Sequence, residues 1–276
     1  MSNVAGLDCV PAPKLPTLVF RVAYDGAAYA GFAEQRDQTT VAGELRRALE
    51  TFLRREVDLT CAGRTDAGVH ALSQYVSMSV ADESELAITQ RRWLRAMDAL
   101  LPRDISINAV FEAPAGFSAR FDARSRTYIY RIADRSDRPV LTRPHVWWHR
   151  MPLDEGAMAE GAAYLIGEHD FKSFCKVASA IGKPTCRNVM SCGLARSNEL
   201  GEDVLAFTIT GNAFLHSMVR TIVGTLVEVG MHRREPAWVG EVLARCDRAA
   251  AGPTAPACGL VFADVAYDEG LLKSVV

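Results

Sequence analysis

Apolar and polar positions alternate along the chain in patterns that predict short strands separated by amphipathic helices. Residues 17–24 alternate and are rich in β-branched side chains, and the Asp25-Gly26 pair ends this predicted strand. Residues 41–55 carry apolar side chains at helical spacing. The same reasoning predicts further strands at 57–62, 74–80 and 104–112 and a helix at 82–101. The order β-α-β-β-α-β is that of a ferredoxin-like unit.

Local signals divide the chain into segments. Asp82 is the expected N-cap of the second helix, with Glu85 at capping-box spacing. We expect residues 1–16 to be a disordered lead-in, 17–113 an N-terminal domain and 114–276 a C-terminal α+β domain, with the boundary at the Pro- and Gly-containing stretch that follows the fourth strand. In the second domain the patterns predict strands at 126–133, 188–195, 204–211 and 260–267 and helices at 153–166, 212–229 and 236–245.

The charges of the chain nearly cancel, with 31 Lys and Arg against 33 Asp and Glu and a net charge of −2. This balance excludes a protein that binds nucleic acid or an anionic membrane through overall positive charge. The distribution leaves room for a local basic cleft, because residues 116–150 hold eight Arg and three Asp. Arg outnumbers Lys by 26 to 5, which suits phosphate recognition, although a GC-rich genome produces the same bias.

Seven cysteines are scattered without a C-x-x-C pair, so neither a zinc ribbon nor a redox dithiol is predicted. The chain shows no dinucleotide-binding loop, no P-loop and no metal-ligand cluster, so no sequence motif predicts a cofactor or a metal. It also lacks a signal-peptide pattern and any apolar run long enough to span a membrane. These features predict a soluble cytoplasmic protein.

The loop at 63–71 carries the densest group of candidate functional residues. Gly63 and Gly68 permit a tight backbone there. Between these glycines lie Arg64 and Asp66, and His70 follows two residues after Gly68. Arg64 could bind a phosphate or keep Asp66 ionised. A polar loop with an internal Arg64–Asp66 pair accounts for the same residues, and the pattern alone leaves both interpretations open.

The loop reads GRTDAGVHA and resembles the signature loop of the tRNA pseudouridine synthase A family. Further segments resemble that family in the same order: AYDG at 23–26, FSARFD at 117–122 with RTYIYR at 126–131, LIGEHDF at 165–171, NAFLHSMVR at 212–220 and APACGL at 255–260. Together the matches span about residues 18–267. Departures from the family pattern occur at Phe32-Ala33 and Ala42-Gly43, which places RNA contacts near the first strand in doubt.

The resemblance implies an α+β pseudouridine synthase fold, with two ferredoxin-like units joined through a mainly antiparallel sheet and an active-site cleft between the halves. It implies an isomerase that converts uridine to pseudouridine in the tRNA anticodon stem-loop, at positions 38 to 40, without a cofactor. It also implies a homodimer that receives tRNA across both subunits.

The family pattern assigns catalytic roles to three residues. Asp66 matches the nucleophile, Arg220 matches the cation that keeps it ionised, and Tyr128 matches the active-site tyrosine, which stacks on uracil or serves proton transfer from C5. The sequence does not choose between attack of Asp66 on C1′ of the ribose and on C6 of the base. On the residues alone, two alternatives stay open: Arg220 reaches solvent from helix 212–229, and Tyr128 is a core residue, as a tyrosine in an alternating strand more often is.

A second set of residues is expected to contact the RNA or the target base. The family pattern places Arg64 beside the flipped-out nucleotide and Leu260 against uracil, while His70 contacts RNA or only supports the loop. Strand alternation places Arg124 and Arg126 on the same face as Tyr128, where they could meet phosphates. Some arginines of the 116–150 segment are expected to pair with Asp122, Asp134 or Asp137 instead.

Two other functions remain open at this stage. One is a non-catalytic RNA-binding protein or tRNA chaperone on the same fold, which the presence of Asp66, Tyr128 and Arg220 disfavours. The other is a hydrolase that uses Asp66 on phosphate esters. A hydrolase of this kind needs an acidic metal-binding cluster, and the sequence near Asp66 contains none.

Overall fold

The computed structural model describes residues 15–276, apart from the side chains of residues 179 and 180. The predicted lead-in at 1–16 therefore lies outside the described residues, except for its last two positions. The strands are β1 (Thr17–Tyr24), β2 (Leu59–Cys61), β3 (His70–Ser79), β4 (Ile105–Ala113), β5 (Ser125–Asp134), β6 (Trp147–His149), β7 (Gly167–Asp170), β8 (Cys186–Glu199), β9 (Glu202–Gly211), β10 (Leu260–Ala266) and β11 (Lys273–Ser274). The α-helices are α1 (Val41–Leu53), α2 (Glu83–Leu86), α3 (Gln90–Leu100), α4 (Glu155–Ala163), α5 (Val177–Ala180), α6 (Met218–Gly230) and α7 (Trp238–Arg245).

The first half forms the ferredoxin-like unit that the sequence predicts. Its strands lie in the order β4-β1-β3-β2, and each neighbouring pair is antiparallel. Helices α1 and α3 pack on this sheet through aromatic edges, with Trp93 of α3 against Phe20 of β1 at 5.3 Å and Phe52 of α1 at 5.1 Å. Burial of these large rings stabilises the helical layer against the sheet.

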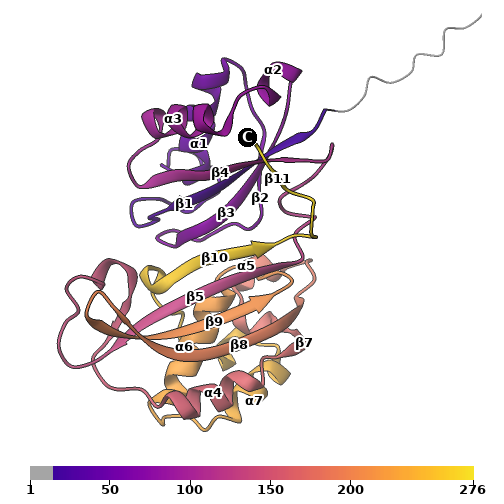
Figure 1. The fold of residues 1–276 in the computed structure, drawn as a ribbon. Helices are drawn as coiled ribbons and strands as arrows, with labels where there is room; N and C mark the ends of the chain where they lie inside the picture. The colour runs from indigo at the N-terminus through magenta and orange to yellow at the C-terminus, as the bar shows by residue number, and fades with distance from the viewer. Residues whose placement is uncertain (1–14) are drawn as a thin grey trace, which may run out of the picture.

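The second half repeats the same arrangement. Its strands lie in the order β10-β5-β9-β8, with α4 following β5 and α6 following β9. If these strands are numbered one to four along the chain, both halves have the spatial order 4-1-3-2. Figure 1 shows the two units stacked, with β10 and β5 at the junction and α4, α6 and α7 covering one side of the lower sheet. The α+β prediction of two joined ferredoxin-like units is confirmed.

One parallel pairing joins the two halves into a continuous sheet. Strand β10 pairs with the start of β3, where Val261 is opposite His70 and Phe262 is opposite Ala71. The chain then returns to the first half, because β11 pairs with β4 (Figure 1). One large hydrophobic core cluster extends through both halves, and a small separate cluster is formed by Ala133, Val146 and Val204. The domain division at 113/114 stays a prediction. No helix within residues 15–276 has both the length and the apolar composition needed to cross a membrane.

The predicted helix at 82–101 is wrong as a single element, because two helices occupy this segment. Asp82 caps only the short α2, and the extended backbone of Thr89 starts α3, where its hydroxyl accepts from the Arg92 amide. Glu85 does not complete a capping box with Asp82. Its carboxylate pairs with Arg55 at 2.5 Å, which draws the α2 turn towards the end of α1.

The predicted helix at 212–229 begins six residues late. Residues 212–217 form an irregular segment, and α6 starts at Met218 after the left-handed backbone of Ser217. The Asn212 side chain accepts from the Asn188 amide at 3.0 Å, which ties this segment to β8 instead of to a helix. The predicted strand at 17–24 matches β1 at both ends, and the other predicted elements differ at their ends by at most four residues. The sequence patterns did not predict the short strands β6, β7 and β11.

Candidate active site

The loop that carries Asp66 lies between β2 and β3 and is held by hydrogen bonds to its neighbours. The buried Gln74 side chain donates to the Gly63 carbonyl at 2.6 Å and accepts from the Gly63 amide at 3.3 Å. Farther along, the Thr65 hydroxyl bonds to the Tyr24 hydroxyl at 2.8 Å, and both residues are buried. These contacts fix the segment of the loop that leads to Asp66.

The segment after β1 packs tightly against this loop at Gly31. Its backbone lies in the left-handed region, with φ of +99°, and an added Cβ would approach the Thr65 carbonyl oxygen to 2.7 Å. The Phe32 amide donates to that same oxygen at 3.1 Å. Only glycine combines this backbone conformation with so close an approach.

Asp66 and Arg220 meet across the junction although 154 positions separate them in sequence. Nη1 of Arg220 donates to Oδ2 of Asp66 at 3.0 Å, and Oγ of Ser217 donates to the same oxygen at 2.7 Å. Nε of Arg220 donates to the Ala255 carbonyl at 2.8 Å, which orients the guanidinium. Both charged side chains are 19% exposed, so the pair is partly shielded but open on one side. Charge-assisted bonds of this kind are stronger than hydrogen bonds between neutral groups.

Asp66 faces a groove of about 1000 Å³ whose walls come from both halves of the chain. Tyr128 and Leu260 line the groove, and their contact with the target base stays a prediction. The Tyr128 ring lies edge-on to Phe214 at 5.1 Å and to Phe262 at 4.9 Å, and Phe262 is also its cross-strand partner. Burial raises the pKa of the Tyr128 hydroxyl, and the Asp66 carboxylate adds to the rise. The site therefore combines an anion, an apolar wall and a protonated phenol.

Arg126 also lines the groove, but its guanidinium is directed into the protein. It donates to the backbone carbonyls of Ala62 at 3.1 and 3.2 Å, Ala123 at 3.1 Å and Asn212 at 2.6 Å, and also to that of Arg120. Burial lowers the pKa of Arg126. Its donors connect the start of the Asp66 loop to the segments before β5 and before α6, so the structure places it as a connecting residue within the site.

The remaining basic residues separate into two groups. Those that line the groove are Arg46, Arg64, Arg120, Lys183 and Arg187. Arg64 is exposed and has no ion-pair partner within residues 15–276, whereas Arg46 pairs with Glu34 at 2.7 Å. Outside the groove, Arg124 forms a bidentate pair with Asp268, and Arg131 pairs with Glu199 at 3.0 Å. The Arg-rich segment thus contributes only part of the basic lining.

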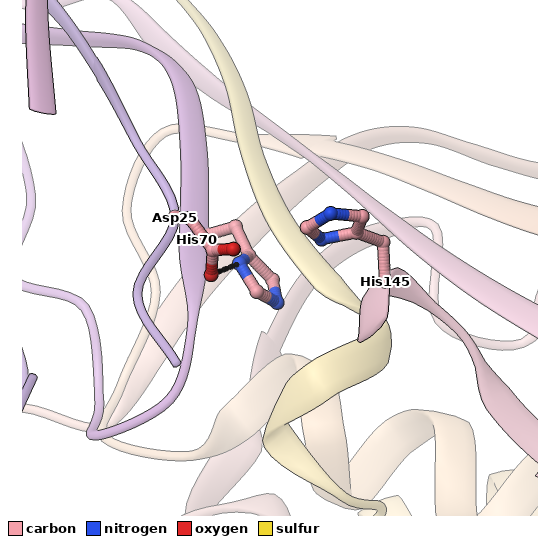
Figure 2. Close-up of side chains that lie close together, drawn as sticks. All are labelled: Asp25, His70 and His145. Atoms are coloured by element: carbon pink, nitrogen blue, oxygen red, sulfur yellow. Dashed lines mark ion pairs between the residues drawn. The ribbon is translucent and has the colours of Figure 1, made fainter. Parts of the chain in front are cut away.

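His70 lies away from the groove, in a group with Asp25 and His145 (Figure 2). Its Nδ1 is 2.9 Å from Oδ1 of Asp25 and accepts from the Gly26 amide at 3.2 Å, and its ring meets that of His145 edge-on at 4.8 Å. One donor atom from each of the three lies within 4.8 Å of the others, which is the only grouping with metal-ligand chemistry in the described part of the chain. The contacts join the end of β1 and the start of β3 to the 3₁₀ turn Arg143–His145.

Several groove residues have no clear signal in the sequence. Ser217 lies inside the helix predicted at 212–229, and a helical backbone at this position gives no sign of its contact with Asp66. Phe214 lies in the same misassigned segment. Lys183 and Arg187 lie outside the segment with the Arg surplus, and nothing in local patterning links them to the loop. The NAFLHSMVR motif at 212–220 contains Phe214 and Ser217, so the family resemblance marks the region of these two residues.

Comparison with known proteins adds independent information. The family model for tRNA pseudouridine synthase matches residues 21–122 and 162–268. A tRNA pseudouridine synthase A from Methylococcus capsulatus is 42% identical over 92% of this chain and 92% of the relative. The protein of that name from Brevibacillus brevis is 41% identical over 89% of this chain and 97% of the relative. The one from Caldicellulosiruptor bescii is 38% identical over 91% of this chain and 99% of the relative.

Proposed function

Because this chain belongs to the tRNA pseudouridine synthase family and is an isomerase that converts uridine to pseudouridine in tRNA, we propose that Asp66 is the nucleophile of that reaction. The observation that carries the proposal is the pairing of Asp66 with Arg220 at the wall of a groove lined by both halves. The implied target is a uridine at positions 38 to 40 of the anticodon stem-loop. The alternative of a non-catalytic RNA-binding protein is not favoured by the family to which the chain belongs.

The reaction breaks the N1–C1′ bond, turns the uracil and joins C5 to C1′, and the hydrogen on C5 moves to solvent. A carboxylate nucleophile divides this rearrangement into two easier steps. Attack on C1′ leaves the electron pair of the broken bond on N1 of uracil. Attack on C6 instead moves the C5–C6 electron pair towards O4. Both forms require an ionised Asp66, which Arg220 supports.

The other groove residues have complementary roles in this proposal. The target uridine leaves the base stack to reach Asp66. The exposed Arg64 contacts the RNA beside the flipped-out nucleotide. Leu260 packs against the uracil, while the Tyr128 ring supports it and the Tyr128 hydroxyl serves proton transfer from C5. Arg120, Lys183 and Arg187 are placed to meet RNA phosphates. Arg124 and His70 support neighbouring segments through Asp268 and Asp25.

We further propose a homodimer in the cytoplasm. Exposed apolar side chains near β7 and β8 support self-association, with Tyr164 43%, Ile166 47% and Met190 47% exposed. The unpaired thiols of the six described cysteines are consistent with a reducing compartment. Sedimentation of the purified protein tests the dimer directly: a mass of one chain would contradict it.

The test of the nucleophile is tritium release from a tRNA transcript labelled at C5 of uridine. The parent protein is expected to release tritium, and Asp66→Ala is expected to release none. Glu34→Ala is the matched control, because Glu34 is an acidic residue of the same groove that pairs with Arg46. Release by Asp66→Ala at the parent rate would refute the assignment, whereas loss of release in both variants would show that the assay reports general damage to the groove.

A further inference from the structure

Ser217 has a backbone conformation that its position does not require. It immediately precedes α6, with φ of +59° and ψ of +12°, in the left-handed region that non-glycine residues rarely adopt. A serine before a helix normally has an extended backbone, from which its hydroxyl accepts a hydrogen bond from the first turn. Here the side chain makes no capping bond. A strained backbone and an unused cap at a functional site indicate that the hydroxyl has another task.

The Ser217 hydroxyl contacts the Asp66 carboxylate instead of the helix. The Ser217 hydroxyl donates to Oδ2 of Asp66 at 2.7 Å, the same oxygen that receives Nη1 of Arg220 at 3.0 Å. Among residues 15–276, no hydrogen bond is found to Oδ1, and Nε2 of His216, on a side chain that is 46% exposed, lies 3.5 Å from it. The two carboxylate oxygens are therefore unequal: one carries two short hydrogen bonds and the other keeps its lone pairs available.

The donors to Oδ2 are themselves fixed. The Ser217 carbonyl accepts from the Thr221 amide at 3.0 Å, which is the first hydrogen bond of α6. Arg220 lies one turn along the same helix, and its Nε is held by the Ala255 carbonyl. Because both donors come from the start of one helix, their spacing is set by the helix and not by two independent loops.

We propose that Ser217 is a positioning residue, which with Arg220 anchors Oδ2 of Asp66 and so assigns Oδ1 as the attacking oxygen. This inference rests on the proposed function, because it concerns the nucleophile named there. Oδ1 supplies the electron pair for the new bond to carbon, and no proton moves to or from Ser217. The left-handed backbone directs the hydroxyl towards the carboxylate instead of back towards the helix.

Ser217→Gly separates this role from a structural one. Glycine suits a left-handed backbone, so the variant should keep or raise the melting temperature while it removes only the hydroxyl. We expect kcat for tritium release to fall about tenfold or more, as for loss of one hydrogen bond to a charged group, with KM for tRNA within about twofold of the parent. Leu200→Gly is the matched control, because Leu200 is another left-handed residue, exposed at the β8–β9 turn, and it should leave kcat unchanged.

The outcomes are distinguishable from failure of the proposed function. If Asp66→Ala is inactive but Ser217→Gly retains the parent kcat, Ser217 has no positioning role and the inference is overturned. If Ser217→Gly raises KM while kcat stays constant, the residue contributes to RNA binding only, which also overturns it. If Asp66→Ala retains activity, the nucleophile assignment itself fails.

Discussion

At the scale of single residues, the role proposed for Tyr128 has two parts, contact through its ring and proton transfer through its hydroxyl. Tyr128→Phe keeps the edge contacts with Phe214 and Phe262 and removes only the hydroxyl. If the hydroxyl serves proton transfer from C5, kcat should fall about a hundredfold or more without loss of thermal stability. Single-turnover tritium release and a melting curve measure the two effects.

Tyr130→Phe is the matched control for this prediction, because Tyr130 lies two positions along β5 and its hydroxyl donates to the Pro256 carbonyl at 2.8 Å. Its loss should lower stability by about 1 kcal/mol and leave kcat near the parent value. A fully active Tyr128→Phe would limit the role of Tyr128 to contact through its ring. Since burial raises the Tyr128 pKa, a step that needs the phenolate should accelerate as pH rises above neutrality, and Tyr128→Phe should lack that acceleration.

Site residues could be predicted from the sequence where they lie in a recognisable motif. Asp66 lies in a dense loop motif, and Arg220 and Tyr128 lie in motifs of their own, so the family resemblance marks all three. Spacing alone could not pair Asp66 with Arg220, because sheet topology brings them together. Ser217 was missed for a physical reason: a helical pattern read through position 217 gives it a solvent-facing side chain, while one left-handed residue turns that side chain towards Asp66.

At the scale of elements, alternation and helical spacing located most strands and helices, as in β5, where buried and half-buried positions alternate from Ser125 to Ile132. Boundaries were less predictable where a side chain bonds outside its own element. Thr89 interrupts a continuous helical pattern because its hydroxyl caps α3, and Asn212 bonds to β8. The short strands β7 and β11 depend on neighbours far away in sequence, which a local pattern does not report.

Arg126 connects three elements, and its replacement tests how much the Asp66 loop depends on them. Arg126→Met keeps much of the side-chain volume but leaves the carbonyls of Ala62 and Asn212 without these donors. Loss of several buried hydrogen bonds should lower the free energy of unfolding by roughly 2–4 kcal/mol. Urea unfolding measures the change, with Arg124→Met as the control, since the Arg124–Asp268 pair is exposed and should contribute little. Equal effects of the two substitutions would contradict a connecting role for Arg126.

At the scale of the whole molecule, two similar units share one sheet, and the site lies where they meet. The parallel pairing of β10 with β3 places Phe262 between Ala71 and Tyr128, so the loop of one unit faces the strand of the other. The groove concentrates basic side chains although the net charge of the chain is −2. Local charge at a shared cleft can therefore serve an RNA substrate without a basic surface elsewhere.

The contacts of His70 with Asp25 and His145 give this junction a predicted pH dependence (Figure 2). Burial lowers the pKa of His70 below its usual 6.5, although the Asp25 carboxylate partly opposes the effect. The unfolded chain therefore binds a proton at higher pH than the folded chain. Stability is fully present above about pH 6.5, falls as pH decreases towards the lowered value, and stops changing from this source below it.

His70→Asn should remove that dependence, because asparagine can still accept from the Gly26 amide but does not titrate in this range. Urea unfolding at pH 7.5, 6.5 and 5.5 should give a smaller loss of stability in the variant than in the parent between the two lower values. His169→Asn is the control, because His169 is a half-buried histidine of β7 whose Nε2 lies 2.9 Å from the Ile166 carbonyl oxygen, so this substitution should leave the pH dependence of the parent's stability intact. If the free energy of unfolding of His70→Asn falls with decreasing pH as steeply as that of the parent, the acid sensitivity belongs to other groups. If only His70→Asn loses this pH dependence, protonation of one buried imidazole weakens the contact between the two units.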